Sequence, residues 1–297
     1  METIMGKYSI KDLETLSGIK AHTIRIWEKR YGVITPDRTD TNIRTYCDSD
    51  LKKLLNVALL NNHGLKISKI SKLDYKDLCE EVEKIGFSES SFDTYIDVLI
   101  VSMVDLDRLK FEKVLKDATD RLGFEDACIN VLYPFLQKIG IMWMANTINP
   151  AQEHFISSLI IQKMYAAIDK LYTPELKENK AIFFLREGEL HEMGLLFYRY
   201  LLEKRGVDTI YLGQSVPMED LKQTVAVHKP DYLVTALVAT FEEDALGAYL
   251  NTLGNTFPVQ KIIVSGFQIS QFAGDIPKNI IKTDDVQQYV DYIGTQL

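Results

Sequence analysis

The stretch Ala181-Ile182-Phe183-Phe184-Leu185, followed closely by Glu189-Leu190-His191-Glu192-Met193-Gly194, decides the fold of this 297-residue chain. The first run is continuously apolar, which is typical of a buried strand. Residues 195–204 predict a helix, so we expect His191 on a loop at the carboxyl end of a strand. Open α/β sheets bind their ligands at that edge. The segment therefore predicts a ligand site in an α/β domain.

The side chains of this loop suit a metal-bound imidazole. Glu189 precedes His191 by two residues, and a carboxylate there can fix the imidazole tautomer and raise its basicity. Gly194 lets a bulky ligand approach the backbone. The alternative is that His191 is an ordinary solvated loop histidine.

The rest of the C-terminal part alternates strands with helices. The predicted strands are 181–185, 208–212, 232–237, 260–264 and 279–283, and a last helix begins at Asp285. Alternating units of this length predict a doubly wound, flavodoxin-like parallel sheet of five strands with helices on both faces.

Composition indicates a globular protein with an uneven charge distribution. Of the residues, 46% are hydrophobic and 26% are charged, and the three cysteines suit neither a disulfide framework nor a zinc cluster. We find no membrane-length apolar stretch and no signal-peptide pattern, so we expect a soluble, cytoplasmic protein without a membrane partner. Residues 1–75 carry a net charge of +4 within a total of −8, so a polyanion is expected to bind there.

The N-terminal segment predicts two short helices joined by a glycine turn. Ser9 and Asp12 have the spacing of a capping box, Ser17-Gly18 ends the first helix, and residues 21–30 form the second. Such a pair is typical of a helix-turn-helix, whose second helix enters the major groove of double-stranded DNA. The alternative is a basic helical hairpin that binds nothing. The candidate DNA-facing residues are Lys20, His22, Thr23, Arg25 and Lys29.

Two further short motifs follow the histidine loop. Between Gly194 and Thr235-Ala236-Leu237 lie 40 residues, and between Leu237 and Ser265-Gly266 lie 27. With the histidine loop, they resemble the cobalamin-binding domain of methionine synthases and corrinoid mutases, in which the pattern is Asp-x-His-x-x-Gly, Ser-x-Leu and Gly-Gly. This chain has Glu for Asp, Thr for Ser, and Ser for the first Gly of the last pair.

The resemblance implies a role for each matching residue. His191 would be the lower ligand of the cobalt, Glu189 would hydrogen-bond to it, and Gly194 would complete the motif. The displaced nucleotide tail of the cofactor would lie beside the later motifs, and a Cβ at the Ser265 position would narrow its channel. The implied tail-lining residues are Thr235, Leu237, Ser265 and Gly266.

Over about 70 residues, the N-terminal part of the chain resembles the DNA-binding domain of MerR-type regulators. The matching stretches are 25–32, Pro36-Asp37-Arg38, and Asn42-Ile43-Arg44-Thr45-Tyr46, and residues 63–70 match a later helix of that domain. The family has a helix-turn-helix, a β-wing and two more helices. By this resemblance, Arg38, Arg44 and Tyr46 would touch DNA phosphates from the wing.

The middle of the chain has helical periodicity and predicts a bundle of four helices. Trp143 is followed ten residues later by Glu153 and His154, on a helix opened by Asn149-Pro150. Adjacent Glu and His side chains at a helix start can simply cap it and face solvent. The Trp-x9-Glu-His spacing, however, resembles the bundle of CarH-like light-sensing repressors, which covers the upper face of adenosylcobalamin. By this resemblance, Trp143 would pack on the upper axial group, and Glu153 and His154 would contact the adenosyl moiety.

One residue departs from the pattern of the light-sensing members. They have a histidine directly after this tryptophan, whereas this chain has Met144. A thioether is a poor ligand for oxidised cobalt, so a stable cobalt adduct with two histidines is not expected after illumination.

Taken together, these features predict three domains, at residues 1–76, 77–175 and 176–297. The expected function is that of a non-enzymatic repressor, without catalytic residues, whose operator affinity and assembly into a dimer or tetramer depend on adenosylcobalamin and light. One alternative is a corrinoid methyl carrier or enzyme subunit, with methylcobalamin. The other is a regulator that binds no cobalamin and is switched by a partner protein.

Overall fold

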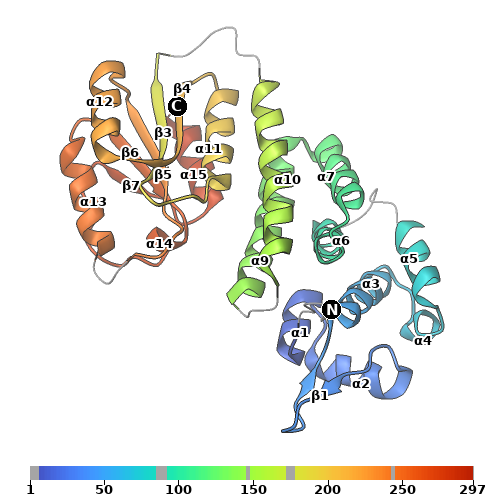
Figure 1. The fold of residues 1–297 in the computed structure, drawn as a ribbon. Coiled ribbons are helices and arrows are strands. Elements are labelled where there is room, and N and C mark those ends of the chain that lie inside the picture. The colour runs from blue at the N-terminus through green and yellow to red at the C-terminus, as the bar shows by residue number, and fades with distance from the viewer. Residues whose placement is uncertain (1–6, 85–91, 145–147, 172–177, 242–244, 297) are drawn as a thin grey trace. The chain divides into compact units, whose positions relative to one another are not determined.

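A computed structural model of the chain describes residues 7–84, 92–144, 148–171, 178–241 and 245–296. Its contacts divide the chain into two compact units, Met1–Ser158 and Leu159–Leu297. Each unit is described by itself, and Figure 1 labels their elements. Among the described residues, no helix is both long and apolar enough to cross a membrane.

The chain begins with a helix-turn-helix. Its helices are α1 (Ile10–Ser17) and α2 (Ala21–Tyr31). The predicted capping box of α1 is confirmed, because the Ser9 side chain accepts from the backbone of Asp12 and the Asp12 carboxylate accepts from Ser9 N–H. Gly18 ends this helix with φ of +70°, which glycine adopts without strain. The turn to α2 therefore depends on this glycine.

A short antiparallel hairpin and three more helices complete the head of the chain. The hairpin pairs β1 (Asp37–Arg38) with β2 (Arg44–Thr45), and a bridge between Tyr8 and Tyr46 continues it. The helices are α3 (Asp48–Asn62), α4 (Ile67–Ile70) and α5 (Tyr75–Lys84). The predicted β-wing is thus present.

The four helices predicted for the bundle are also present. They are α6 (Phe92–Val104), α7 (Arg108–Leu122), a third helix, and α10 (Pro150–Asp169), which crosses the boundary between the two units. The third helix is continuous and consists of α8 (Phe124–Ala127), a π-helical segment (Cys128–Leu132) and α9 (Tyr133–Met144). The sequence pattern did not predict the π-helical segment.

The second unit contains the predicted five-stranded parallel sheet. Its order is β4-β3-β5-β6-β7, which places β3 between β4 and β5. The strands are β3 (Lys180–Arg186), β4 (Asp208–Val216), β5 (Tyr232–Ala236), β6 (Lys261–Ser265) and β7 (Ile280–Lys282). The β4 strand extends beyond the predicted range because a register shift opposite Phe184 lets it continue past Gly213, whose φ is +80°.

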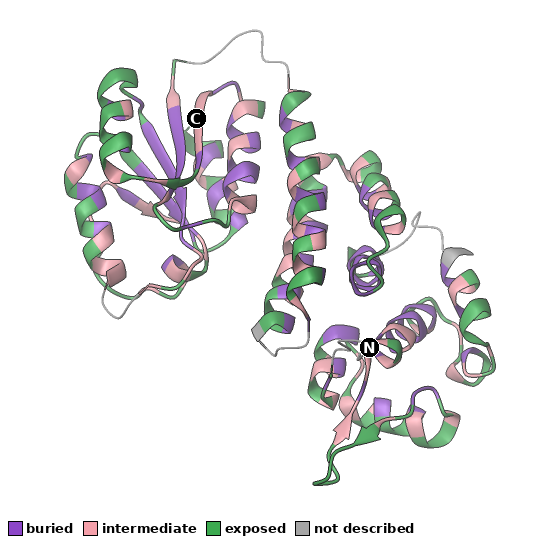
Figure 2. Ribbon diagram, in the orientation of Figure 1, coloured by how far each residue is buried: buried purple, intermediate pink, exposed green. Residues whose placement is uncertain are grey.

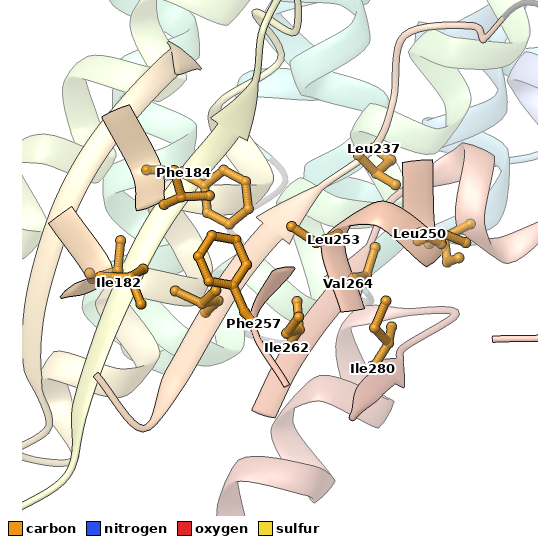
Figure 3. Packing of buried hydrophobic residues seen from close by; sticks show 13 residues of the cluster. Ile182, Phe184, Leu237, Leu250, Leu253, Phe257, Ile262, Val264 and Ile280 are labelled. Atoms are coloured by element: carbon orange, nitrogen blue, oxygen red, sulfur yellow. The ribbon is translucent and has the colours of Figure 1, made fainter. Parts of the chain in front are cut away.

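Helices cover both faces of the sheet, as Figure 1 shows. They are α11 (Met193–Lys204), α12 (Met218–His228), α13 (Ala245–Thr256), α14 (Phe267–Ser270) and α15 (Val286–Gln296). Figure 2 shows β3, β5 and β6 mostly buried and the outer helix faces exposed, whereas the edge strand β4 is largely of intermediate exposure. One buried cluster joins Ile182 and Leu233 of the sheet to Leu221 of α12 and Leu253 of α13, and most of it is drawn in Figure 3. This core fixes the strand ends that carry the predicted ligand site.

Candidate functional site

The loop after β3 holds His191 against Glu189. Glu189 is fully buried, whereas the side chain of His191 is 58% exposed. The His191 Nδ1 lies 2.5 Å from Glu189 Oε1. A metal ion would therefore be bound through Nε2, with Nδ1–H oriented by the carboxylate.

Glu189 also connects this loop to the end of β5. Its Oε2 accepts hydrogen bonds from the backbone N–H groups of Val238 and Ala239, at 2.9 and 2.7 Å. Its Oε1 accepts from the N–H of His191 at 3.1 Å. Burial alone would raise the pKa of Glu189, but the bonds from His191 and from these backbone groups outweigh it and lower the pKa to about 2. The carboxylate is thus charged at neutral pH and rigidly held.

The later motifs meet at the carboxyl ends of β5 and β6. Ala236 pairs with Ser265, and Leu237 N–H donates to the Ser265 carbonyl at 2.8 Å. A Cβ on Gly266 would lie 2.5 Å from the Leu237 carbonyl oxygen, and its φ is +103°. Gly266 is therefore required by the packing of this corner. Since Glu189 binds the segment just after Leu237, the structure brings all three motifs to one sheet edge.

The edge has features that fit cobalamin. The imidazole of His191, backed by a carboxylate, is a suitable cobalt ligand. The Thr235 hydroxyl is buried and has no hydrogen-bond partner among the described residues, which is unusual for a native protein. No atom lies within 4 Å of a Cβ built on Gly194, so the backbone there is open to approach. Ser265 is buried, and its hydroxyl donates weakly to the Thr235 carbonyl at 3.5 Å.

Sequence reasoning missed a tyrosine pair beside His191. The Glu192 carboxylate accepts from Tyr211 Oη at 2.7 Å and from Tyr165 Oη at 3.3 Å. Tyr165 lies on the part of α10 that belongs to the second unit. Burial, with the hydrogen bond to Glu192, raises the pKa of Tyr211 well above its usual value. The residue following the proposed ligand thus ties α10 to the sheet, a contact that no local pattern indicates.

The three residues predicted above the cofactor lie on α9 and α10. Trp143 is 47% exposed, which is unusual for so large an apolar side chain. Pro150 is the first residue of α10, as predicted. Glu153 is half-buried and accepts from Ser157 Oγ at 3.1 Å, while His154 is exposed. The side chain of Met144 lies outside the described part of the chain.

Most predicted DNA-binding side chains face solvent. Thr23 and Arg44 are half-buried. The exposed ones are Lys20, His22, Arg25, Lys29 and Arg38. Ile24 and Trp27 of α2 are buried, so this helix has the expected inner and outer faces. Arg38 is oriented by the wing turn, since its Nη1 donates to Asn42 Oδ1 at 2.6 Å.

Tyr46 differs from the expectation for a residue that touches phosphate. It is 1% exposed, and its hydroxyl lies 3.4 Å from Glu28 Oε2. Glu28 also pairs with Arg44 at 3.3 Å, and this contact raises the pKa of Arg44. The backbone bridge to Tyr8 turns Tyr46 into the core. Tyr46 therefore lies behind Glu28 and Arg44, and Arg38 and Arg44 remain the wing residues that are predicted to contact phosphates.

Two family profiles match separate parts of the chain. Residues 8–76 match the family described as MerR HTH family regulatory protein. Residues 95–168 match the family described as B12 binding domain, which covers most of the helical bundle.

The chain is similar along most of its length to two repressors of Myxococcus xanthus. It is 30% identical to the HTH-type transcriptional repressor CarH over 257 residues, which cover 84% of this chain and 85% of CarH. It is 28% identical to the HTH-type transcriptional repressor CarA over 250 residues, which cover 80% of this chain and 82% of CarA.

Among solved structures, the monomethylamine corrinoid protein of Methanosarcina barkeri has a similar fold. The TM-score is 0.53 at 18% identity, and the match covers 69% of this chain and 98% of that one. At 18% identity, this similarity shows a shared fold and nothing further.

Proposed function

Because the chain belongs to the family of CarH-like repressors, which combine a MerR-type helix-turn-helix with a B12-binding domain, we propose that it senses adenosylcobalamin and light. It is a DNA-binding transcriptional repressor whose B12-binding domain indicates a cobalamin cofactor. The observation that carries the proposal is the buried Glu189 carboxylate, which orients His191 at the sheet edge where all three motifs meet.

In the proposed complex, each residue has one task. His191 Nε2 would ligate the cobalt, and Glu189 would keep the imidazole in the required tautomer. The hydroxyl of Thr235 would form a hydrogen bond with the tail of the cofactor. Trp143, Glu153 and His154 would contact the adenosyl group of the cofactor.

When bound, adenosylcobalamin supplies a cobalt–carbon bond that light can break. The proposed contacts of Trp143, Glu153 and His154 would depend on the adenosyl group, so they would be present only while the protein holds that group. A ligand shifts a conformational equilibrium only through contacts that differ between the two states, and these contacts differ. We propose that the dark state favours a dimer or tetramer.

Assembly would then control operator affinity. A single helix-turn-helix domain makes few contacts to DNA, whereas linked copies gain effective concentration at neighbouring half-sites. In each copy, α2 enters the major groove, and Arg38 and Arg44 bind phosphates from the wing. Repression is therefore expected in the dark with cofactor bound.

The experiment combines absorbance, chromatography and DNA binding. Purified protein is incubated with adenosylcobalamin in the dark, desalted, and analysed by visible absorbance, size-exclusion chromatography and binding to its own promoter, before and after illumination. We expect retained cofactor, a larger dark assembly, and weaker DNA binding in the light. His191→Ala should weaken cofactor binding and change the spectrum, whereas His228→Ala, at an exposed position on α12, should change neither.

Each alternative has a distinct outcome. Retained cofactor with identical dark and lit elution would contradict the light switch and leave a sensor of cobalamin. Methylcobalamin retained in preference to adenosylcobalamin, without DNA binding, would favour a corrinoid carrier. No retained cobalamin of either form would favour a regulator switched by a partner protein.

A further inference from the structure

The loop that carries His191 is held by the edge strand β4 as well as by the end of β5. Its Gly188 N–H donates to Ser215 Oγ at 3.1 Å, and Ser215 N–H donates to the Glu189 carbonyl at 3.2 Å. Ser215 has a φ of +51°, which is unfavourable for a residue with a Cβ and persists only where the surrounding structure fixes it. The loop and the end of β4 are therefore firmly connected.

Glu192 ends this loop and connects it to a further element. It is the residue before α11, yet its side chain makes no capping hydrogen bond to that helix. Its Oε2 accepts instead from Tyr211 Oη of β4 at 2.7 Å and from Tyr165 Oη of α10 at 3.3 Å. One carboxylate oxygen, on the residue next to His191, thus joins the loop, the sheet and α10.

The two tyrosine contacts differ in how firmly they are held. Tyr211 is half-buried, and the Arg199 guanidinium lies over its ring, 5.2 Å from the centroid. Arg199 in turn donates to Glu203 at 2.6 Å. Tyr165 is 41% exposed and makes the longer bond. A single hydrogen bond adds little to the stability of a fold, so the contact of Glu192 with Tyr165 can open while Tyr211 and the sheet stay in place.

We propose that Glu192 is a positioning residue that couples the His191 loop to α10, and that Tyr165 is the side chain by which this helix docks. The coupling rests on the proposed function, in which His191 binds cobalt. Docking of α10 on Glu192 restricts the loop to the arrangement that presents the imidazole. Because coupling between two sites is reciprocal, binding of cobalt by His191 in turn favours the docked helix. The same helix carries Glu153 and His154, the residues proposed to contact the adenosyl group.

Hydrogen exchange of the full chain without cofactor tests the docking. Tyr165→Phe and Glu192→Ala should each speed exchange in residues 159–169 by about three- to tenfold, because each removes the hydrogen bond that docks this part of α10. Exchange in β3 and β5 should stay as in the wild type. Tyr95→Phe is the matched control, since it removes a tyrosine–carboxylate bond of 2.8 Å to Asp117 in the bundle. Unchanged exchange in the first two variants, or an equal increase in the control, would overturn the docking.

Titration with adenosylcobalamin in the dark, followed by visible absorbance, tests the coupling. The affinity should fall by about three- to tenfold in Tyr165→Phe and in Glu192→Ala. It should be largely restored in Glu192→Gln, whose amide oxygen can still accept from both tyrosines. Bound cofactor should slow exchange in residues 159–169 of the wild type, and should slow it less in Tyr165→Phe.

The outcomes separate the coupling from the function on which it rests. A wild type that retains no cobalamin would refute the proposed function and the coupling with it, while the exchange of the cofactor-free variants would still report the docking of α10. Equal cobalamin affinity of the wild type, Tyr165→Phe and Glu192→Ala would overturn the coupling alone. A loss of affinity in Glu192→Gln as large as in Glu192→Ala would also overturn it, because the charge and not the tyrosine contacts would then be responsible.

Discussion

Glu189 in the α/β unit and Glu28 in the DNA-binding head both hold a basic side chain, but by different means. Glu189 is fully buried and accepts from backbone N–H groups of two loops as well as from His191. The side chain of Glu28 is 16% exposed, and its recorded partners are the side chains of Arg44 and Tyr46. The Glu189 carboxylate is thus held by backbone hydrogen bonds, whereas the Glu28 carboxylate pairs with other side chains.

The difference suits the two ligands that we propose, cobalt at His191 and DNA phosphate at Arg44. A cobalt ligand needs one fixed imidazole geometry, which several short hydrogen bonds in a buried position supply. A phosphate contact tolerates variation, because a guanidinium can bind phosphate oxygens in several arrangements and the attraction acts through charge. Substitutions in the two regions should therefore differ in size and in kind.

Glu189→Gln should have the largest effect on stability. The lowered pKa, about 2 against an ordinary value of 4.5, means that the folded state favours the carboxylate. Its contribution, about 3 kcal/mol, is fully present above pH 4.5 and is lost as the pH falls toward 2. In the glutamine variant, the stability at pH 7 should fall by about that amount, and this part of the acid dependence should disappear. Urea denaturation across this pH range measures both.

Glu187→Gln is the matched control for this substitution. Glu187 is exposed and lies two residues before Glu189, so its replacement should change stability by less than about 0.5 kcal/mol. If Glu189→Gln kept the acid profile of the wild type, the buried carboxylate would not be the group that titrates.

Glu28→Gln should have a smaller effect, about 1–2 kcal/mol, since its pair with Arg44 is partly solvated. A double-mutant cycle with Arg44→Met should give a coupling energy of about 1 kcal/mol. Cobalamin affinity should be unchanged in Glu28→Gln, in Arg44→Met and in the double variant. A coupling energy near zero would show that the wing is positioned by its backbone bridge to Tyr8 instead.

The sequence predicts the parts of each region that are local. The pairing of Glu189 with His191 follows from a spacing of two residues, and the capping box of α1 from a spacing of three. The backbone clamp on Glu189 comes from Val238 and Ala239, which are 49 and 50 residues away. That contact depends on β3 and β5 being neighbours, so it requires the strand order and not only the strands.

The sequence also does not predict which individual polar side chains are buried. Tyr46 follows a strand of two residues, which is too short for alternation to indicate its direction. Its burial arises from pairing with Tyr8, 38 residues earlier in the sequence. Likewise, the unpaired hydroxyl of Thr235 and the Tyr211–Glu192 contact are properties of the packed structure. Functional pairs were thus easier to predict than the groups that support them.

Thr235→Val should have an effect of opposite sign, a stabilisation of about 0.5–1 kcal/mol in the cobalamin-free protein. The buried hydroxyl has no partner among the described residues, and valine has nearly the same shape. Cobalamin affinity should fall at the same time, because the tail loses a hydrogen bond. Thr283→Val is the control, since its hydroxyl lies 3.5 Å from the Val264 carbonyl, and it should destabilise slightly. Thermal melting with and without cofactor separates these effects, and equal destabilisation by both variants would contradict the assignment.

Arg25→Ala should have almost no effect on stability, yet it distinguishes the two regions most sharply. Arg25 is exposed on the outer face of α2, so its loss should change the free energy of unfolding by less than about 0.5 kcal/mol. If it contacts a phosphate, the slope of log affinity against log salt concentration should become shallower by about 1. Lys222→Ala, on α12 of the α/β unit, removes the same charge from another exposed helix and should leave the slope unchanged. Equal slopes for Arg25→Ala and the wild type would mean that the solvated face of α2 does not meet DNA phosphates. The division between a rigid cofactor region and a charge-based DNA region would then lose its support in the head.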